Sequence, residues 1–225
     1  MSGEFPRGFV ETWEDFEKDN VTNFTETVAS SATQDVSSKH GGWWVQTLAG
    51  DDADALLLAG ERCYEVDEGH PLIFETRLYV TDADKASVFV GFTDDNAESV
   101  AVVIEDEDGT LNTVATDAFG FMLEGEQDAT WQVMGVQTDV DNTQAALTSA
   151  ADAGDSVIQT LRLEANPNSS GTVYHFIDGK LCTTNGTKTS WFGSGIVFCV
   201  ALSSDDRATA YTACYDYIYA CAPRS

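Results

Sequence analysis

The chain has 225 residues, of which 43% are hydrophobic and 11% aromatic, a composition typical of a folded globular protein. It carries 38 acidic residues against 11 Lys and Arg, which gives a formal net charge of −27 at pH 7. Such a surface repels phosphate groups and anionic lipid, so we expect neither a nucleic-acid nor a membrane partner, and it favours solubility. The acid surplus also suits docking onto a basic surface or a saline environment.

The N-terminal segment lacks the features of an export signal. Residues 1–7 contain neither a basic region nor an apolar run, and longer apolar stretches such as residues 196–202 are too short to span a bilayer. We therefore expect synthesis in the cytoplasm without a signal peptide. Five cysteines without a C-x-x-C spacing argue against a disulfide framework and a zinc ribbon, and Cys199 and Cys214 are expected to be small apolar core residues.

Residues 1–12 are predicted to form an extended arm, followed by one domain over residues 13–225. The arm contains two glycines and a proline among its first eight residues. The aromatic residues around it alternate with acids and have no clear place in one short strand, so we expect them to form an interface with a neighbouring subunit. The alternative is a first strand that lies on its own sandwich. These interface candidates are Phe5, Phe9, Trp13 and Phe16.

Strand patterns dominate the first half of the chain. Only residues 51–58 and the alanine-rich residues 143–151 could form a short helix, and the second segment reads more readily as a loop. Residues 73–80 alternate large apolar and polar side chains, as a half-buried strand does. Residues 82–85 form a turn, and residues 87–92 form the next strand, so this pair predicts an antiparallel hairpin.

The same pattern continues to the C-terminus. Residues 99–104 are β-branched and run into an acidic turn at residues 105–109. Residues 157–165 and 172–177 predict a second hairpin, and Asp178-Gly179 predicts a tight turn after it. Two further strands, residues 195–202 and 209–219, complete the pattern. Strands separated by turns, with no helices between them, predict an antiparallel β-sandwich or barrel.

No segment carries a convincing catalytic or metal-binding pattern. Among residues 65–68 the third acid comes one residue too early and falls on the wrong strand face for a catalytic set of carboxylates. Residues 105–109 offer acids on one face, but Gly109 places them in a turn, so both segments read as solvated acidic loops. The oxygen-rich residues 82–84, 94–96 and 139–142 lack the spacing of a calcium loop. We therefore expect no catalytic residue, no metal and no cofactor. The histidines have no metal-ligand spacing, and His175 is expected to fill a half-buried slot in a strand.

Two aromatic pairs are candidates for a ligand face or a subunit interface. Trp43-Trp44 follows two glycines, and Trp191-Phe192 follows a Thr/Ser-rich loop. Successive residues on a strand face opposite sides, so one residue of each pair is expected in the core and the other at the surface. An exposed Trp43, Trp44 or Trp191 could stack on a sugar or on a neighbouring subunit. The plainer interpretation is packing in the core and at the sheet edge.

Several stretches together resemble concanavalin A-like and laminin-G-like jelly rolls. They are FETRL at residues 74–78, VFVGFTD at 88–94, LRLE at 161–164, VYHFIDGK at 173–180 and CYDYI at 214–218. In a chain without a signal, the set is similar to capsid decoration (cement) proteins of tailed bacteriophages. The resemblance implies an antiparallel jelly-roll β-sandwich that binds the major capsid protein on the exterior of the virion, often as a homotrimer, and stabilises the head without catalysis.

Two other functions remain open for the same fold. One is a carbohydrate-binding, lectin-like module for which a glycan is the partner and which a virion could display. The other is a glycoside hydrolase or lyase. An exposed tryptophan beside paired polar groups would favour the first, and two convergent acids in a cleft would favour the second. The legume-lectin metal and sugar residues do not map onto this sequence.

Overall fold

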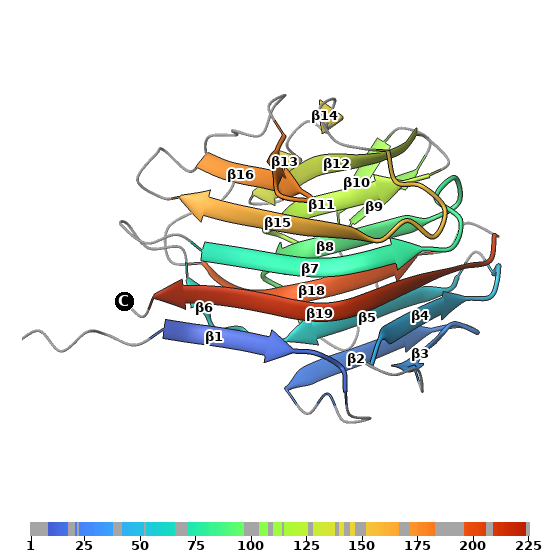
Figure 1. The fold of residues 1–225 in the computed structure, drawn as a ribbon, viewed down its shortest axis with the longest axis horizontal. Coiled ribbons are helices and arrows are strands. Elements are labelled where there is room, and N and C mark those ends of the chain that lie inside the picture. The colour runs from blue at the N-terminus through green and yellow to red at the C-terminus, as the bar shows by residue number, and fades with distance from the viewer. Residues whose placement is uncertain are drawn as a thin grey trace, which may run out of the picture.

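The computed structural model folds the chain into two facing antiparallel β-sheets (Figure 1). Among the residues described, none is helical. Within them, no helix is long and apolar enough to cross a membrane. The structure describes residues 9–17, 21, 23–37, 42–51, 53–65, 72–96, 104–107, 110–113, 115–125, 128–137, 140–141, 145–146, 152–166, 172–182, 196–205 and 209–223.

The first sheet lies in front in Figure 1, and we call it the open sheet. The long strand β19 (Tyr211–Pro223) pairs along one side with two strands in succession: β4 (Trp44–Leu48) along its first half and β1 (Phe9–Glu14) along its second half. In spatial order the strands are β17 (Lys180–Leu181), β16 (Thr172–Ile177), β15 (Gln159–Asn166), β7 (Leu72–Val80), β19 (Tyr211–Pro223), β4 (Trp44–Leu48) and β3 (Thr33–Val36), with β1 (Phe9–Glu14) beside β19.

The second sheet lies behind the first, and we call it the covered sheet. A separate hairpin joins β9 (Ile104–Glu107) to β10 (Thr110–Thr113). In spatial order the strands of the covered sheet are β13 (Val140–Asp141), β12 (Asp128–Gln137), β11 (Ala118–Glu124), β8 (Ser87–Thr93), β18 (Val197–Asp205), β5 (Ala55–Gly60) and β2 (Phe24–Ala29), with β14 (Ala145–Ala146) beside β12 and β6 (Tyr64–Glu65) beside β18.

The main core fills the space between the sheets. Phe92 of β8 contacts the rings of Tyr64, Phe74 and Phe119 at centroid distances of 5.5, 5.8 and 5.3 Å. These four side chains are fully buried and come from both sheets. Aromatic pairs at such distances add to the stability gained from burying their area, so this cluster holds the two layers together.

The two sheets differ in what covers their outer faces. On the covered sheet, a second buried cluster that includes Leu57, Phe89, Met122 and Met134 packs on the outer face. β5, β8 and β11 are therefore buried on both sides. On the open sheet, β7 alternates buried residues with Glu75, Arg77 and Tyr79 on the outside. Its outer face therefore carries partly exposed polar and aromatic side chains.

A β-bulge in β19 changes which residues reach that outer face. Tyr215 pairs with Leu78 and Tyr217 pairs with Arg77, so Asp216 is the extra residue. Before the bulge Tyr211, Ala213 and Tyr215 are buried, and after it Ile218 and Ala220 are buried. A bulge shifts the alternation by one residue. Tyr217 and Tyr219 consequently lie on the outer face.

The concanavalin A-like jelly-roll β-sandwich expected from the sequence is the observed fold. β15 and β16 form the expected hairpin, and β16 turns into β17 through Asp178 and Gly179. Both turn residues have positive φ, of 51° and 74°, as a tight hairpin turn requires. Residues 143–151 contribute the short strand β14 within the part described.

Four local expectations are wrong. β7 and β8 do not form a hairpin, because residues 81–86 carry the chain from the open sheet to the covered sheet. The second half of the helix considered at residues 51–58 belongs to strand β5, whose leucines are buried on both faces. His175 is fully buried, not half-buried, and contacts Phe121 at 5.0 Å. In addition, the acidic residues 105–107, expected in a turn, belong to β9.

Candidate functional site

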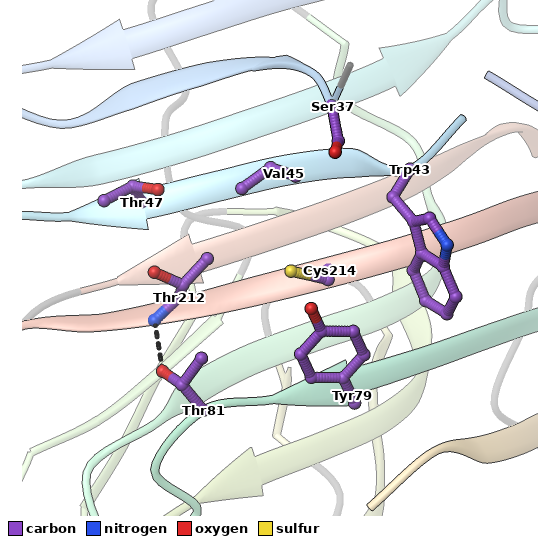
Figure 2. A pocket seen from close by; sticks show the side chains of 8 residues that line it. All are labelled: Ser37, Trp43, Val45, Thr47, Tyr79, Thr81, Thr212 and Cys214. Carbon is purple, nitrogen blue, oxygen red and sulfur yellow. Dashed lines mark hydrogen bonds between the residues drawn. The ribbon is translucent and has the colours of Figure 1, made fainter. Parts of the chain in front are cut away.

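A pocket of about 500 Å³ lies on the outer face of the open sheet. This volume is within the range of about 300–1,000 Å³ that is common for small-ligand sites. Figure 2 shows the side chains that line it, which come from the residue after β3, from β4 and the residue before it, from β7 and the residue after it, and from β19. They are Ser37, Trp43, Val45, Thr47, Tyr79, Thr81, Thr212 and Cys214.

The strand register explains why this part of the face is hollow. Cys214 of β19 lies between Val45 of β4 and Tyr79 of β7. One step along the outer face, Thr212 pairs with Thr47, and its amide donates to Thr81 Oγ1 at 2.9 Å. The outward positions of β4 and β19 carry small side chains here, while large rings stand beside them. The small residues form the floor of the pocket.

Trp43 and Tyr79 form the aromatic wall. Their rings lie 5.3 Å apart with an interplanar angle of 63°, and Figure 2 shows both next to Cys214. The amide of Ser37 donates to the Trp43 carbonyl at 2.7 Å, which fixes the chain next to the tryptophan. A hydrogen bond with Cys214, together with burial, raises the pKa of Tyr79 to about 12. Tyr79 therefore keeps its proton at neutral pH and is able to donate a hydrogen bond.

The chemistry of the lining is aromatic and hydroxyl-rich, without a charged side chain. Ser37, Thr47, Thr81 and Thr212 each supply a hydroxyl that donates and accepts, and Tyr79 supplies another. The wall offers flat apolar area. Such a surface complements a neutral ligand that has apolar faces and hydroxyl edges. Within the described residues, no group of three His, Cys, Asp or Glu is placed to hold a metal ion.

The aromatic pair Trp43-Trp44 divides as the strand alternation predicts. Trp43 is half-buried and forms the pocket wall, whereas Trp44 is only 2% exposed and contacts Phe16 in the core at 5.8 Å. Trp44 is therefore corrected from a ligand or interface candidate to a core residue. Trp191 lies outside the described residues.

The four interface candidates near the N-terminus have different environments in the structure. Phe5 lies outside the described residues, and Phe9 is the first residue of β1, so residues 9–12 of the expected arm are paired with β19. Trp13 is 60% exposed on the outer face. Phe16 is fully buried, and it is corrected from an interface residue to a core residue because its ring packs on Trp44.

Several residues of this face were not singled out from the sequence. Tyr79 was placed only within a strand, and Cys214 was expected in the core; it is buried, but its side chain lines the pocket. The alternation of residues 73–80 was the signal that could have placed Tyr79 outside, next to Glu75 and Arg77. The sequence contained no equally direct signal for the meeting of β4, β7 and β19.

Comparison with known proteins supports the fold but shows no family. No family model matches the chain, and no curated protein matches it in sequence. The carbohydrate recognition domain of Emp46p, in its potassium-bound form, superposes with a TM-score of 0.60 at 12% identity and covers 92% of this chain and 93% of its own. The lectin UEA-II, complexed with galactose, gives a TM-score of 0.60 at 11% identity, with 96% and 99% covered.

A third similar structure comes from a bacteriophage. It is a carbohydrate esterase of the Shiga toxin-encoding bacteriophage phi24B, with a TM-score of 0.50 at 19% identity over 91% of this chain and 92% of that one. At these identities the likeness shows the fold alone. These similar structures are thus a carbohydrate recognition domain, a lectin and a carbohydrate esterase.

Proposed function

We propose that this protein is a lectin-like carbohydrate-binding module whose ligand is a neutral sugar held in the pocket of Trp43 and Tyr79. One observation carries the proposal: an uncharged pocket of about 500 Å³ combines an aromatic wall with a hydroxyl-rich lining on an outer sheet face. Two of the structures with this fold are carbohydrate-binding domains, which supports the same function.

The ligand chemistry follows from the lining. Sugar rings present C–H faces that pack on aromatic side chains, and hydroxyl edges that exchange hydrogen bonds with Ser, Thr and Tyr. The pocket contributes no cation, and the chain as a whole carries a formal charge of −27. Acidic sugars are therefore disfavoured by long-range repulsion.

Trp43→Ala is expected to weaken sugar binding at least tenfold. It removes the larger half of the aromatic wall, and an aromatic anchor that dominates a binding site contributes about 2 kcal/mol or more to binding. An array of neutral and acidic saccharides that includes galactose, glucose and mannose would identify the preferred sugar, and titration calorimetry would give its affinity. Trp43→Tyr keeps a flat ring and is expected to retain most of the affinity.

A matched control separates local from global effects. Ile158 is 53% exposed and is not among the residues that line the pocket, so Ile158→Ala is expected to leave affinity unchanged. If Trp43→Ala binds neutral sugars with unchanged affinity, the binding site lies elsewhere on the protein. Absence of binding to every saccharide on the array would reject the proposed function.

Capsid decoration, the leading expectation from the sequence, stays a prediction, as do the major capsid protein partner, the homotrimer and the location on the virion exterior. A sugar-binding subunit displayed on a virion would combine both functions. The likeness to a bacteriophage carbohydrate esterase is compatible with that combination and adds only the fold.

A further inference from the structure

A second aromatic surface lies on the outer face of the open sheet, beyond the bulge in β19. Trp13 of β1 stacks on Tyr217 with a centroid distance of 5.2 Å and an interplanar angle of 19°, and it contacts Tyr219 at 6.0 Å. We call Trp13, Tyr217 and Tyr219 the platform. With Trp13 60% exposed, the platform presents a large indole ring to solvent.

Polar groups adjoin the platform in an ordered network. The Tyr217 hydroxyl donates to Glu75 Oε1 at 2.6 Å, and Glu75 Oε2 accepts from Arg162 Nη1 at 3.1 Å. Arg162 also pairs with Glu164 at 2.8 Å. Burial and the hydrogen bond to Glu75 raise the pKa of Tyr217, so its hydroxyl keeps its proton as the donor.

These polar side chains remain accessible to a ligand. Glu75, Arg162 and Glu164 are 26%, 32% and 34% exposed. Arg162 pairs with both carboxylates, so the network offers oriented donors and acceptors and keeps a net charge of only −1. Like the pocket, the platform combines aromatic area with hydrogen-bonding groups, although its polar neighbours are charged and those of the pocket are hydroxyls.

The register places the platform and its polar neighbours in one line. Trp13 pairs with Tyr219, Tyr219 with Glu75, Glu75 with Arg162, and Arg162 with Phe176. The line therefore crosses β1, β19, β7, β15 and β16 on a single sheet face. Figure 1 shows these strands side by side.

The platform and the pocket share one strand. Cys214 lines the pocket and Tyr219 belongs to the platform, and both lie on the outer face of β19. They are five positions apart along the strand, which corresponds to about 15 Å. Between them, Arg77 of β7 forms an ion pair with Asp216, the bulge residue, so this stretch is polar and neutral overall. A single sugar ring in the pocket cannot reach the platform.

We infer that the platform is a second subsite for the same ligand, which is a chain of neutral sugars lying along β19 and not a single sugar. The inference rests on the proposed function and adds the length of the ligand to it. A second copy of this chain is the less favoured occupant, because two copies that each carry a formal charge of −27 repel each other. Continuity with the pocket favours one ligand across both surfaces.

The test compares ligands of increasing length on three proteins. Titration calorimetry would use galactose, glucose and mannose with their linear oligosaccharides up to the hexasaccharide, on the wild type, Trp13→Ala and Trp43→Ala. Trp13→Ala is expected to weaken the longest oligosaccharide at least about tenfold and to leave the monosaccharide unchanged. Trp43→Ala is expected to weaken both. Val28, 49% exposed on β2 of the other sheet, gives the control Val28→Ala.

The outcomes separate the inference from the proposed function. The second subsite is rejected if wild-type affinity does not rise with the length of the oligosaccharide. It is also rejected if Trp13→Ala leaves oligosaccharide affinity unchanged while Trp43→Ala lowers it. In both cases the pocket remains the proposed sugar site. If light scattering shows that Trp13→Ala turns a dimer into a monomer without changing oligosaccharide affinity, the platform is a contact between copies and the inference fails. If the wild type binds no saccharide, both proposals fail.

Discussion

Gly120→Ala is expected to lower the free energy of unfolding by about 3 kcal/mol. Gly120 of β11 lies directly opposite Gly91 of β8, in the middle of the covered sheet. A Cβ at Gly120 would lie 2.2 Å from the Val90 carbonyl oxygen and 3.0 Å from both Gly91 Cα and the Phe89 ring. The nearest of these atoms belongs to the backbone of a central strand, so relief requires the sheet itself to move, at the upper end of the usual cost of overpacking.

Urea denaturation of Gly120→Ala and Gly179→Ala would check this expectation. Gly179 is in the turn after β16 with φ of 74°, and a Cβ there would meet nothing within 4 Å. Its substitution carries only the conformational cost of a left-handed alanine, about 1–2 kcal/mol. A larger loss at Gly179 than at Gly120 would show that backbone conformation, and not close strand contact, dominates.

Cys214→Phe is expected to reduce sugar affinity about a hundredfold or more while the sandwich stays folded. Cys214 is on the pocket floor between Val45 and Tyr79, so a phenyl group there would occupy the space meant for the ligand. Its side chain lies on the outer face of the open sheet, away from the main core between the sheets. Losing the contacts of a filled pocket corresponds to about 3 kcal/mol of binding free energy.

Two variants make the result of Cys214→Phe interpretable. Cys214→Ser keeps the size of the floor and a hydrogen-bonding partner for Tyr79, and it is expected to bind sugar normally. Val28→Phe adds the same ring at an exposed position on the other sheet, and it too is expected to leave binding unchanged. Calorimetry would give the affinities and thermal unfolding would verify the fold. Normal affinity of folded Cys214→Phe would place the ligand outside the pocket.

The fold was predictable because its strands obey simple rules. The burial of residues 73–80 alternates strictly along β7. In the β15–β16 hairpin, turn-forming residues stand before and after β16 in the sequence. The pairing partner of each strand was harder to predict from the sequence. Residues 82–85 look like a hairpin turn, yet β7 pairs with β15 and β19 while β8 pairs with β11 and β18. A short loop can join two sheets as easily as two strands of one sheet, and the local sequence does not distinguish them.

The candidate site was only partly predictable, for two physical reasons. The pocket joins β4, β7 and β19, which are far apart in the chain. Local patterns therefore placed one residue of the Trp43-Trp44 pair at a surface without deciding which one or naming its neighbours. The platform depends on the bulge at Asp216, which reverses the alternation of β19. A clue was present in the sequence, because Tyr215 and Ile218 are both large and apolar yet three residues apart, so a regular strand could not bury both.

The most direct test of a sugar-binding face on the open sheet is a map of backbone amide chemical shifts during titration with the best-binding neutral oligosaccharide. We predict that the largest changes fall on β4, on β7 near Tyr79 and along β19 from Thr212 to Tyr219, and that they extend to Trp13 with the longer ligand. Changes confined to the covered sheet and its connections would contradict this account, because they would place the ligand on the opposite side of the sandwich.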